Sequence, residues 1–318
     1  MMAAARLATG ELVAFPTETV YGLGADAANP DAVAKIFAAK GRPPDHPVIV
    51  HVADAGGLET WARNVPEMAR RLAARFWPGP LTMILARSGR TSNAVTGGQD
   101  SVGLRCPSHP IAQELLREFA REGSGAIAAP SANKFGHVSP TTAEHVRDEF
   151  GPDLMILDGG ACDVGIESTI VDLSRGEPVL LRPGAVTHDD LEQTLGTTVR
   201  ERDAAAPRAS GTLAAHYAPR TTLVLVTPAT LDEEVRSMTN VAVLAMRTAP
   251  RNALATSWIE ASRDPARYAH DLYANLRKLD ACGAKRILVE APPMTSRWEA
   301  VNDRLGRAAA GSPDDRET

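Results

Sequence analysis

The 318-residue sequence has little cysteine and no long apolar run. Its three cysteines, Cys106, Cys162 and Cys282, lie far apart and form no C-x-x-C pair, which argues against a disulfide framework and a thiolate metal site. No apolar segment approaches the roughly 20 residues that a membrane helix requires, and the first residues lack the apolar core of a secretory signal. We therefore expect a cytoplasmic protein with reduced thiols and no membrane contact.

The sequence also has no excess of positive charge and few aromatic residues. Its formal net charge is −5, whereas a protein held to nucleic acid by bulk electrostatics needs a clustered cationic surface. Aromatic residues make up only 4% of the chain, so few side chains are available to stack on bases. This composition disfavours a general nucleic-acid-binding protein and leaves room for a local basic cleft.

The pattern that is present is typical of an α/β fold. Short apolar segments bounded by glycine, proline and polar residues alternate with longer helical patterns. Helices are predicted from Asn29-Pro30 onward and near residues 67–76, 110–120 and 140–150. Strands are predicted in the segments that begin at residues 11, 47, 81, 101, 125, 154, 168 and 178. The last two follow each other across residues 174–177 with no helix between, and this hairpin predicts a mixed sheet.

The composition changes after Gly184. Residues 200–220 contain few large apolar side chains and carry Pro207, Gly211 and Pro219, which is typical of a linker. Buried-strand and helix patterns resume beyond it. We predict a large N-terminal domain over residues 1–186, a linker over 187–220, and a small second α/β domain over 221–318.

Two common phosphate-binding motifs do not account for this sequence. No G-x-x-x-x-G-K-[ST] loop occurs. Gly22, Gly24 and Ala27 match the G-x-G-x-x-[GA] dinucleotide pattern, but the predicted helix begins only at Pro30. Its N-terminus would therefore not meet a pyrophosphate held by these glycines. Thr17, Glu18 and Thr19, just before them, either hold a polar ligand or form a turn that satisfies its own backbone groups.

Basic side chains follow the first predicted helix. Lys40 and Arg42 lie two residues apart at its end, beside prolines that stiffen the chain. Cations favour a helix C-terminus without any ligand. Two cations on a rigid turn, followed by a strand that bears His51, also make a plausible anion receptor.

Further polar residues stand at the ends of predicted strands. Ser131 and Asn133 follow a strand of small residues, and Ser139 precedes a predicted helix, so these residues either line a site at the strand ends or serve as turn and cap residues. Arg105 and Arg182 each end an apolar strand. Because an unpaired buried charge is costly, each either pairs with an acidic side chain or binds an anionic ligand.

Seven segments, taken in order, resemble the Sua5/YrdC family of L-threonylcarbamoyladenylate synthases over roughly residues 7–186. They are FPTETVYGLGAD, KGRPPDHPVIVH, FWPGPLTMIL, SVGLRCP, APSAN followed by SP, ESTIVDL and LLRPGAV. SGTLAAHYAPR and the segments LYANLRKLDACGAKRILVEAPP and AVNDRLGRAA are similar to the linker and C-terminal domain of the long Sua5 form. The resemblance implies a YrdC-like domain with a twisted mixed sheet, a linker that acts as a lid, and a small Rossmann-like C-terminal domain.

The resemblance also implies a reaction, namely the formation of L-threonylcarbamoyladenylate and pyrophosphate from L-threonine, bicarbonate and ATP. This is nucleotidyltransferase chemistry that serves threonylcarbamoylation of adenosine 37 in tRNA. A separate threonylcarbamoyl-transferase complex would use the product, and we expect at most a weak direct contact with tRNA. Mg²⁺ is expected to enter with ATP, held by the nucleotide and by no metal ligands of the protein.

The site residues that the resemblance implies fall into three overlapping sets. The catalytic set is Lys40, Arg42, Ser131 and Asn133. The L-threonine set is Thr19, His51, Arg105 and Ser168. The ATP set is Arg42, His46, Ser101, Ser131, Ser139, Arg182 and Tyr217, of which His46 stands where many relatives carry asparagine.

Two other classes of function are weighed against this enzyme. A non-catalytic RNA-binding module could use the same basic cleft, although the acidic composition and scarce aromatics disfavour it. A carbamoyl-phosphate-using enzyme is suggested by related domains of hydrogenase-maturation carbamoyltransferases. Those proteins carry zinc-finger-like cysteine clusters, which this sequence lacks.

Overall fold

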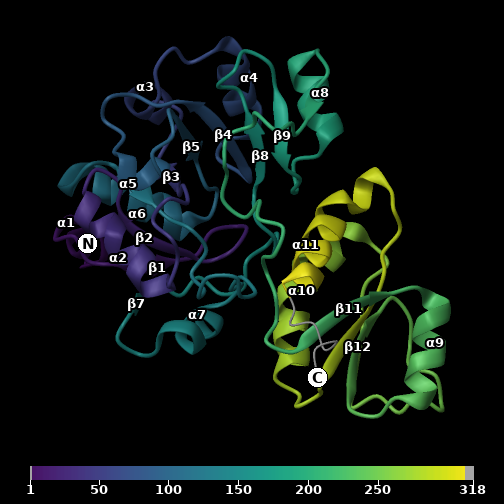
Figure 1. Cartoon of the computed structure of the whole chain (residues 1–318). Coiled ribbons are helices and arrows are strands. Elements are labelled where there is room, and N and C mark those ends of the chain that lie inside the picture. The colour runs from purple at the N-terminus through teal and green to yellow at the C-terminus, as the bar shows by residue number, and fades with distance from the viewer. Residues whose placement is uncertain (1, 312–318) are drawn as a thin grey trace. The chain divides into compact units, whose positions relative to one another are not determined.

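The computed structural model describes residues 2–311, so the predicted outer domain bounds at residues 1 and 318 lie outside the described range. The chain divides into two compact units (Figure 1). The first comprises the residues up to Phe135 together with Pro140–Thr212. The second comprises Gly136–Ser139 together with the described residues from Leu213 onward. The residues of the predicted linker are therefore divided between the two units.

The strands of the first unit form a ten-stranded sheet in the order β10-β9-β8-β4-β5-β3-β6-β2-β1-β7. β8 and β9 pair antiparallel whereas β3 and β5 pair parallel, which confirms the predicted mixed sheet and the hairpin before residue 178. The strands are β1 (Val13–Phe15), β2 (Gly22–Asp26), β3 (Ile49–Val52), β4 (Leu81–Ala86), β5 (Ser101–Arg105), β6 (Ala126–Ala128), β7 (Met155–Ile156), β8 (Thr169–Asp172), β9 (Val179–Arg182) and β10 (Arg200–Glu201).

The helices of the first unit begin at local capping signals. Asn29 Oδ1 accepts hydrogen bonds from the backbone N–H groups of Asp31 and Ala32, which confirms the predicted start of α2. The helix predicted near residue 140 begins at Ala143, where the Thr142 side chain is the cap, so Ser139 does not cap it. The helices are α1 (Met2–Ala8), α2 (Pro30–Lys40), α3 (Gly57–Trp61), α4 (Glu67–Phe76), α5 (Asn93–Thr96), α6 (Pro110–Glu122), α7 (Ala143–Phe150) and α8 (His188–Leu195).

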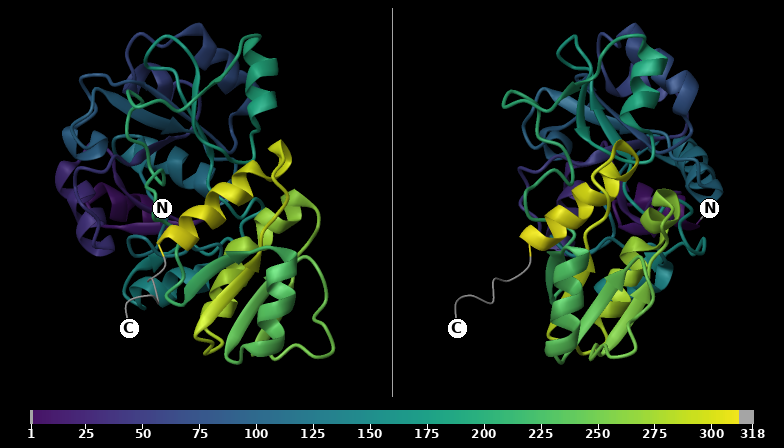
Figure 2. Two further views of the ribbon diagram at one scale, coloured as in Figure 1. Left: turned by 45° about the vertical axis from the view of Figure 1, so that its right-hand side comes forward. Right: turned by 90° about the vertical axis from the view of Figure 1, so that its right-hand side faces the viewer.

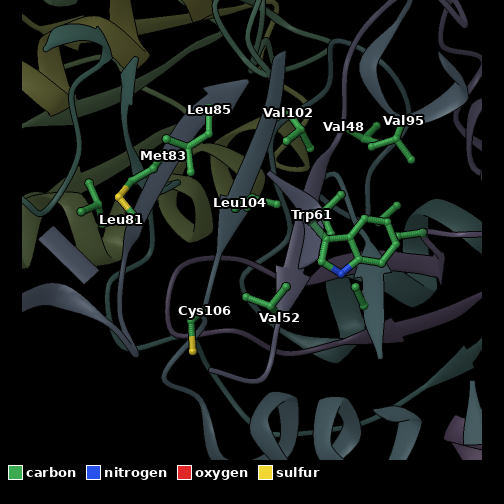
Figure 3. Packing of buried hydrophobic residues seen from close by; sticks show 14 of the residues in the cluster. Val48, Val52, Trp61, Leu81, Met83, Leu85, Val95, Val102, Leu104 and Cys106 are labelled. Atoms are coloured by element: carbon green, nitrogen blue, oxygen red, sulfur yellow. The ribbon is translucent and has the colours of Figure 1, made fainter. Parts of the chain in front are cut away.

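Alternation along the central strands separates the two faces of this sheet. Leu81, Met83 and Leu85 of β4 lie in one buried apolar cluster with Val102 and Leu104 of β5 (Figure 3). Because successive side chains of a strand point to opposite faces, the residues between them lie on the other face. That second face carries the polar end of β5.

The segment GLGAD is a strand, β2, which the sequence analysis missed. Its glycines allow close packing within the sheet. A Cβ on Gly24 would lie 2.8 Å from Ile127 Cγ2 and 2.9 Å from Phe15 Cε1, far too close for a side chain. β2 pairs antiparallel with both β1 and β6, and no helix begins where a dinucleotide fingerprint would need one. The structure thus agrees with rejecting that fingerprint.

The second unit contains a four-stranded parallel sheet in the order β11-β14-β12-β13, as expected of a Rossmann-like domain. β13 was not predicted. α9 lies on one side of β11 and β12, with α10 and α11 on the other (Figure 1), and Figure 2 shows the strands side by side. The elements are β11 (Thr222–Val226), α9 (Pro228–Ser237), β12 (Val241–Ala245), β13 (Ser257–Glu260), α10 (Pro265–Asp280), β14 (Arg286–Glu290), a 3-10 turn at Ser296–Trp298 and α11 (Glu299–Ala310). Across residues 2–311, every helix is too short or too polar to span a bilayer.

Candidate active site

Three central strands bring polar side chains together on the second face of the large sheet. Arg105 of β5 is the register partner of His51 on β3 and of Thr82 on β4. Directly opposed residues of neighbouring strands project to the same face, so these three side chains are neighbours. Each is at most 4% exposed. The structure therefore brings together two residues of the predicted threonine set, His51 and Arg105.

Glu18, for which the sequence left a polar ligand and a self-satisfied turn as alternatives, adds a carboxylate to this group and belongs to none of the three predicted sets of site residues. Its Oε1 lies 2.8 Å from Arg105 Nη2, and both side chains are almost fully buried. Its Oε2 accepts a hydrogen bond from the backbone N–H of Ser108 at 3.1 Å. The alternatives left open for Arg105, an acidic partner or a ligand, are thus partly resolved, because an acidic partner is present.

The threonines that flank Glu18 have different roles. Thr17 Oγ1 donates to the carbonyl of Val20 at 2.6 Å and accepts from the N–H groups of Thr19 and Val20. Thr17 therefore satisfies its own turn, as one of the two open interpretations predicted. The Thr19 hydroxyl lies 2.9 Å from Thr17 Oγ1 and is completely buried. This turn holds Glu18 in place between them.

Several buried polar atoms in this cluster make no hydrogen bond with any described residue. They are Glu18 Oε1, His51 Nδ1, and Nε and Nη2 of Arg105. Glu18 Oε1 and Arg105 Nη2 nevertheless lie 2.8 Å apart as an ion pair, so His51 Nδ1 and Arg105 Nε are the two atoms of this cluster with no partner among the described residues. Burial, together with the nearby charge of Arg105, lowers the pKa of His51 to about 3, so its ring is neutral at physiological pH. Most buried polar groups in proteins are hydrogen-bonded, and an exception calls for an explanation. A bound ligand that supplies the missing hydrogen-bond partners is such an explanation.

Ser168 stands beside this cluster and is tied to two strands. Its hydroxyl lies 2.8 Å from Thr82 Oγ1. Arg182, at the end of β9, donates from Nε to the Ser168 carbonyl at 3.0 Å and from Nη2 to its hydroxyl at 3.2 Å. Arg182 Nη1 donates to the carbonyl of Ser210 at 2.8 Å. The predicted threonine ligand Ser168 and the predicted ATP ligand Arg182 are therefore in direct contact.

Lys40 lies beneath the turn that contains Ser131 and Asn133. Its Nζ donates to the carbonyl of Ser131 at 2.6 Å and also to the carbonyl of Asn133. Burial, with a further contribution from Arg42, lowers the pKa of Lys40 well below its usual range. The structure thus brings three predicted catalytic residues together, with the lysine holding the backbone of the other two.

Arg42 and His46 lie in the segment that leads into β3. Arg42 Nη2 donates to the carbonyl of Pro47 at 2.8 Å, and its guanidinium lies 6.0 Å from the ring of Phe37. The His46 ring lies 5.5 Å from that of Phe135, and burial and the charge of Arg42 lower its pKa. These two predicted ATP ligands adjoin one another in the first unit.

Ser101, at the start of β5, lines a small cavity that the linker helps to form. Ile49, Ile84 and Gly103 line the same cavity, and so do Arg208 and Ser210 of the linker. The linker was predicted to act as a lid, but these contacts were not anticipated. They place part of the linker on the second face of the sheet, the face that also carries His51 and Arg105.

The linker is fastened there by specific bonds. The Arg208 backbone N–H donates to Gln99 Oε1 at 2.7 Å, and Arg208 Nη2 donates to the Gly97 carbonyl at 2.8 Å. Ala206 and Ala209 pack against an apolar cluster that includes Ile49. Only the tertiary structure shows this fastening, since alanine and arginine in a linker carry no distinctive sequence signal.

Ser139 and Tyr217, the remaining predicted ATP ligands, belong to the second unit. Both are buried, and Tyr217 has a left-handed backbone with φ 62°. Its ring lies 5.7 Å from that of Tyr273 and 5.4 Å from the guanidinium of Arg304. Contact of either residue with ATP stays a prediction.

Acidic, histidine and cysteine side chains do not gather into a metal-binding group of three or more within residues 2–311. The basic side chains described above can bind phosphate oxygens, and phosphate oxygens can in turn bind a divalent metal ion.

Two protein-family models match this chain. The Sua5/YrdC model, described as Telomere recombination, matches residues 5–184. A second model, described as Threonylcarbamoyl-AMP synthase, C-terminal domain, matches residues 186–310.

Similar curated proteins cover nearly the whole chain. The Threonylcarbamoyl-AMP synthase of Pyrococcus abyssi is 38% identical over 97% of this chain and 93% of the relative. The enzyme of the same name from Bacillus subtilis is 40% identical over 97% of this chain and 92% of the relative. The crystal structure of P. abyssi Sua5 complexed with L-threonine matches with a TM-score of 0.86 at 37% identity, covering 98% of this chain and 95% of that chain.

Proposed function

Because this chain belongs to the Sua5/YrdC family of threonylcarbamoyl-AMP synthases, in the long form with a Sua5 C-terminal domain, we propose that it makes L-threonylcarbamoyladenylate. Its substrates are L-threonine, bicarbonate and ATP, and pyrophosphate is the second product. The reaction is a nucleotidyl transfer to a carbamate oxygen. The observation that carries this proposal is the buried polar face of the large sheet, where His51, Arg105 and Ser168 gather with unsatisfied hydrogen-bonding atoms.

This face supplies a site for the amino acid. The guanidinium of Arg105 grips the threonine carboxylate through two N–H groups. Thr19, Ser168 and the neutral imidazole of His51 offer short polar contacts around the rest of the molecule. The threonine nitrogen attacks bicarbonate, water is lost, and a carbamate forms.

The nucleotide is held by the groups around β3 and β9. Arg42 and Arg182 offset the negative charge that develops when the carbamate oxygen attacks the α-phosphate and pyrophosphate leaves. Lys40 acts on the same step by fixing the turn of Ser131 and Asn133, because its ammonium donates to their carbonyls. Holding the reactants in line accounts for much of the remaining acceleration.

A carbamate is short-lived in water, so the site must exclude solvent. Linker residues 206–210 lie over the same face of the sheet as the polar cluster: Ala209 packs on an apolar cluster that includes Ile49, Arg208 fastens the segment, and the Ser210 carbonyl accepts from Arg182. This cover protects the intermediate until the α-phosphate is attacked.

Mg²⁺ is proposed to arrive with ATP, bound by phosphate oxygens, and to supply further charge neutralisation there. The product is proposed to pass to a separate transferase complex that modifies tRNA, and the protein is proposed to act in the cytoplasm.

The test is pyrophosphate release from ATP, measured with and without L-threonine and bicarbonate, and identification of the adenylate by mass spectrometry. We expect release to require both additions. Tight ATP binding with no release at saturating substrates would overturn the proposal, and a salt-sensitive tRNA complex indifferent to ATP would favour the RNA-binding alternative.

A further inference from the structure

A hollow on the first unit shares no residue with the three predicted sets of site residues. It encloses about 460 Å³, within the roughly 300–1,000 Å³ that is usual for small-molecule sites. Its lining contains no hydrophobic residue and consists of Arg63, Arg87, Ser88, Gly89, Thr91, Ser92, Asn93 and Asp100. We propose that this hollow is a second binding site, which takes a small oxyanion of the phosphate class.

The hollow is formed by the connection between β4 and β5. That connection, residues 87–100, supplies every lining residue except Arg63. The N–H of Arg63 donates to the carbonyl of Ala86 at 2.9 Å, which brings the segment after α3 beside the connection. Asp100 lines this hollow, whereas its neighbour Ser101 lines the cavity that the linker helps to form. The hollow is therefore separate from the proposed ATP site, and the inference does not depend on the proposed function.

The first argument is an excess of positive charge. Two guanidiniums and one carboxylate line the hollow, which leaves one positive charge. The Asp100 side chain is 89% exposed, and its Oδ1 lies 3.8 Å from Arg87 Nε. An exposed ion pair of this kind contributes about 0–1 kcal/mol, so Asp100 offsets little of the attraction for an anion. Arg63 is exposed, and its side chain makes no hydrogen bond or ion pair with the described residues.

The second argument is that the lining offers unused donors. Arg87 Nη1 donates to Asn93 Oδ1 at 2.6 Å, which occupies the acceptor of this amide and leaves its Nδ2 group as a donor. The Ser92 hydroxyl is buried and has no hydrogen-bond partner within residues 2–311. A buried hydroxyl without a partner calls for an explanation, and an anion that accepts from it is one.

The third argument is that the chain around the hollow is already held in shape. Ser88 Oγ donates to the carbonyl of Thr60 at 2.9 Å, and Thr91 Oγ1 donates to the carbonyl of Trp61 at 3.0 Å. A site that is held in its binding conformation loses less entropy when a ligand binds.

The class of ligand follows from these groups. Guanidinium, amide and hydroxyl donors are the groups that bind phosphate oxygens in proteins, and arginine does so through paired N–H groups. Adenine and other large apolar groups are bound by apolar and aromatic side chains, which the lining lacks. The ligand is therefore inorganic phosphate or the phosphate group of a small polar compound such as a sugar phosphate.

The first experiment measures hydrogen–deuterium exchange of the whole chain in phosphate and in chloride at equal ionic strength. We expect phosphate to slow exchange across residues 87–96, because a ligand that binds the folded connection suppresses its local opening. Equal exchange in the two salts would overturn the proposal.

Two further probes distinguish the sources of the phosphate group. Stronger protection by ribose 5-phosphate than by inorganic phosphate would support an organic phosphate, and equal protection would support the inorganic ion. Protection by ribose alone would contradict recognition of an oxyanion.

Two variants remove donors that make no bond within the described chain, so neither should impair folding. Arg63→Gln should raise the phosphate concentration needed for protection about ten-fold, and Ser92→Ala about three-fold. Arg63→Lys should restore part of the affinity. Undiminished protection in Arg63→Gln would overturn the proposal.

Arg90→Gln is the matched control. Arg90 is an exposed arginine of the same connection that does not line the hollow, so its loss should change the affinity less than about two-fold. A loss equal to that in Arg63→Gln would mean general attraction of anions and would contradict a defined site. Arg63→Gln should also keep the wild-type rate of pyrophosphate release in phosphate-free buffer. A large fall in that rate would place the hollow in the catalytic machinery and overturn its assignment as a second site.

Discussion

The two sheets of this protein differ in how polar residues are distributed along their strands. β12 of the second sheet is VAVLA, and all five residues are buried. β5 of the first sheet is SVGLR, in which Val102 and Leu104 enter the apolar core and Ser101 and Arg105 belong to the other face. A parallel sheet covered by helices on both faces is typically apolar throughout, whereas alternation shows that one face serves another purpose. In the first sheet that purpose is a buried polar site under a linker.

Removing the positive charge of Arg105 from the polar face of the first sheet should have the largest effect on the difference between the two sheets. Arg105→Met would leave Glu18 buried without its partner, which costs about 3–5 kcal/mol. We expect threonine-dependent pyrophosphate release to fall below detection, while denaturant unfolding shows a less stable first unit. Arg121→Met, at an exposed position on α6, is the control and should leave both measurements unchanged.

A cavity in the apolar sheet should affect stability without affecting substrate binding. Leu244→Ala, in the middle of β12, should lower the free energy of unfolding of the second unit by about 3 kcal/mol. Circular dichroism in denaturant would measure the loss, and initial rates would measure the KM for threonine. An altered KM would show that the two sheets do not divide their roles in this way.

Lys40 sharpens the comparison because it is a buried charge that acts through backbone carbonyls. Lys40→Met removes two charge-assisted hydrogen bonds to the turn of Ser131 and Asn133, each worth about 1.5–3 kcal/mol. We expect kcat to fall about ten-fold or more, because the turn loses its position. Lys35→Met, on the same helix and exposed, should retain wild-type kcat. Wild-type kcat in a folded Lys40→Met protein would exclude this role.

The smallest expected effect is a pH dependence of stability due to His51. Its pKa is about 3 in the folded chain and near 6.5 in an unfolded one, so the unfolded state binds the extra proton between these values. Stability is fully present above about pH 6.5 and falls as the pH drops toward 3, by about 1.5 kcal/mol between pH 6.5 and 5. Urea unfolding at both pH values, compared with His51→Gln, would measure this. An equally steep decline in the variant would assign it to other groups.

Sequence patterns predicted the fold better than they predicted individual contacts. The strands at residues 81–86 and 101–105, the helix at 67–76 and the start of α2 all follow from local apolar spacing and capping residues. β2 was missed because glycines disfavour strands in isolation, and close contact with Phe15 and Ile127 outweighs that preference. Thr142, rather than Ser139, caps α7, since the cap depends on where the chain turns.

The sequence by itself determined the α/β class, the mixed sheet and the set of polar residues at strand ends, since these depend on residues close together in the chain. The tertiary structure alone decided which of them meet. Lys40 reaches the carbonyl of Ser131 across 91 residues, and Glu18 reaches the backbone of Ser108 across 90. Such contacts depend on strand order and register, which bring distant segments together, and local propensity does not encode them.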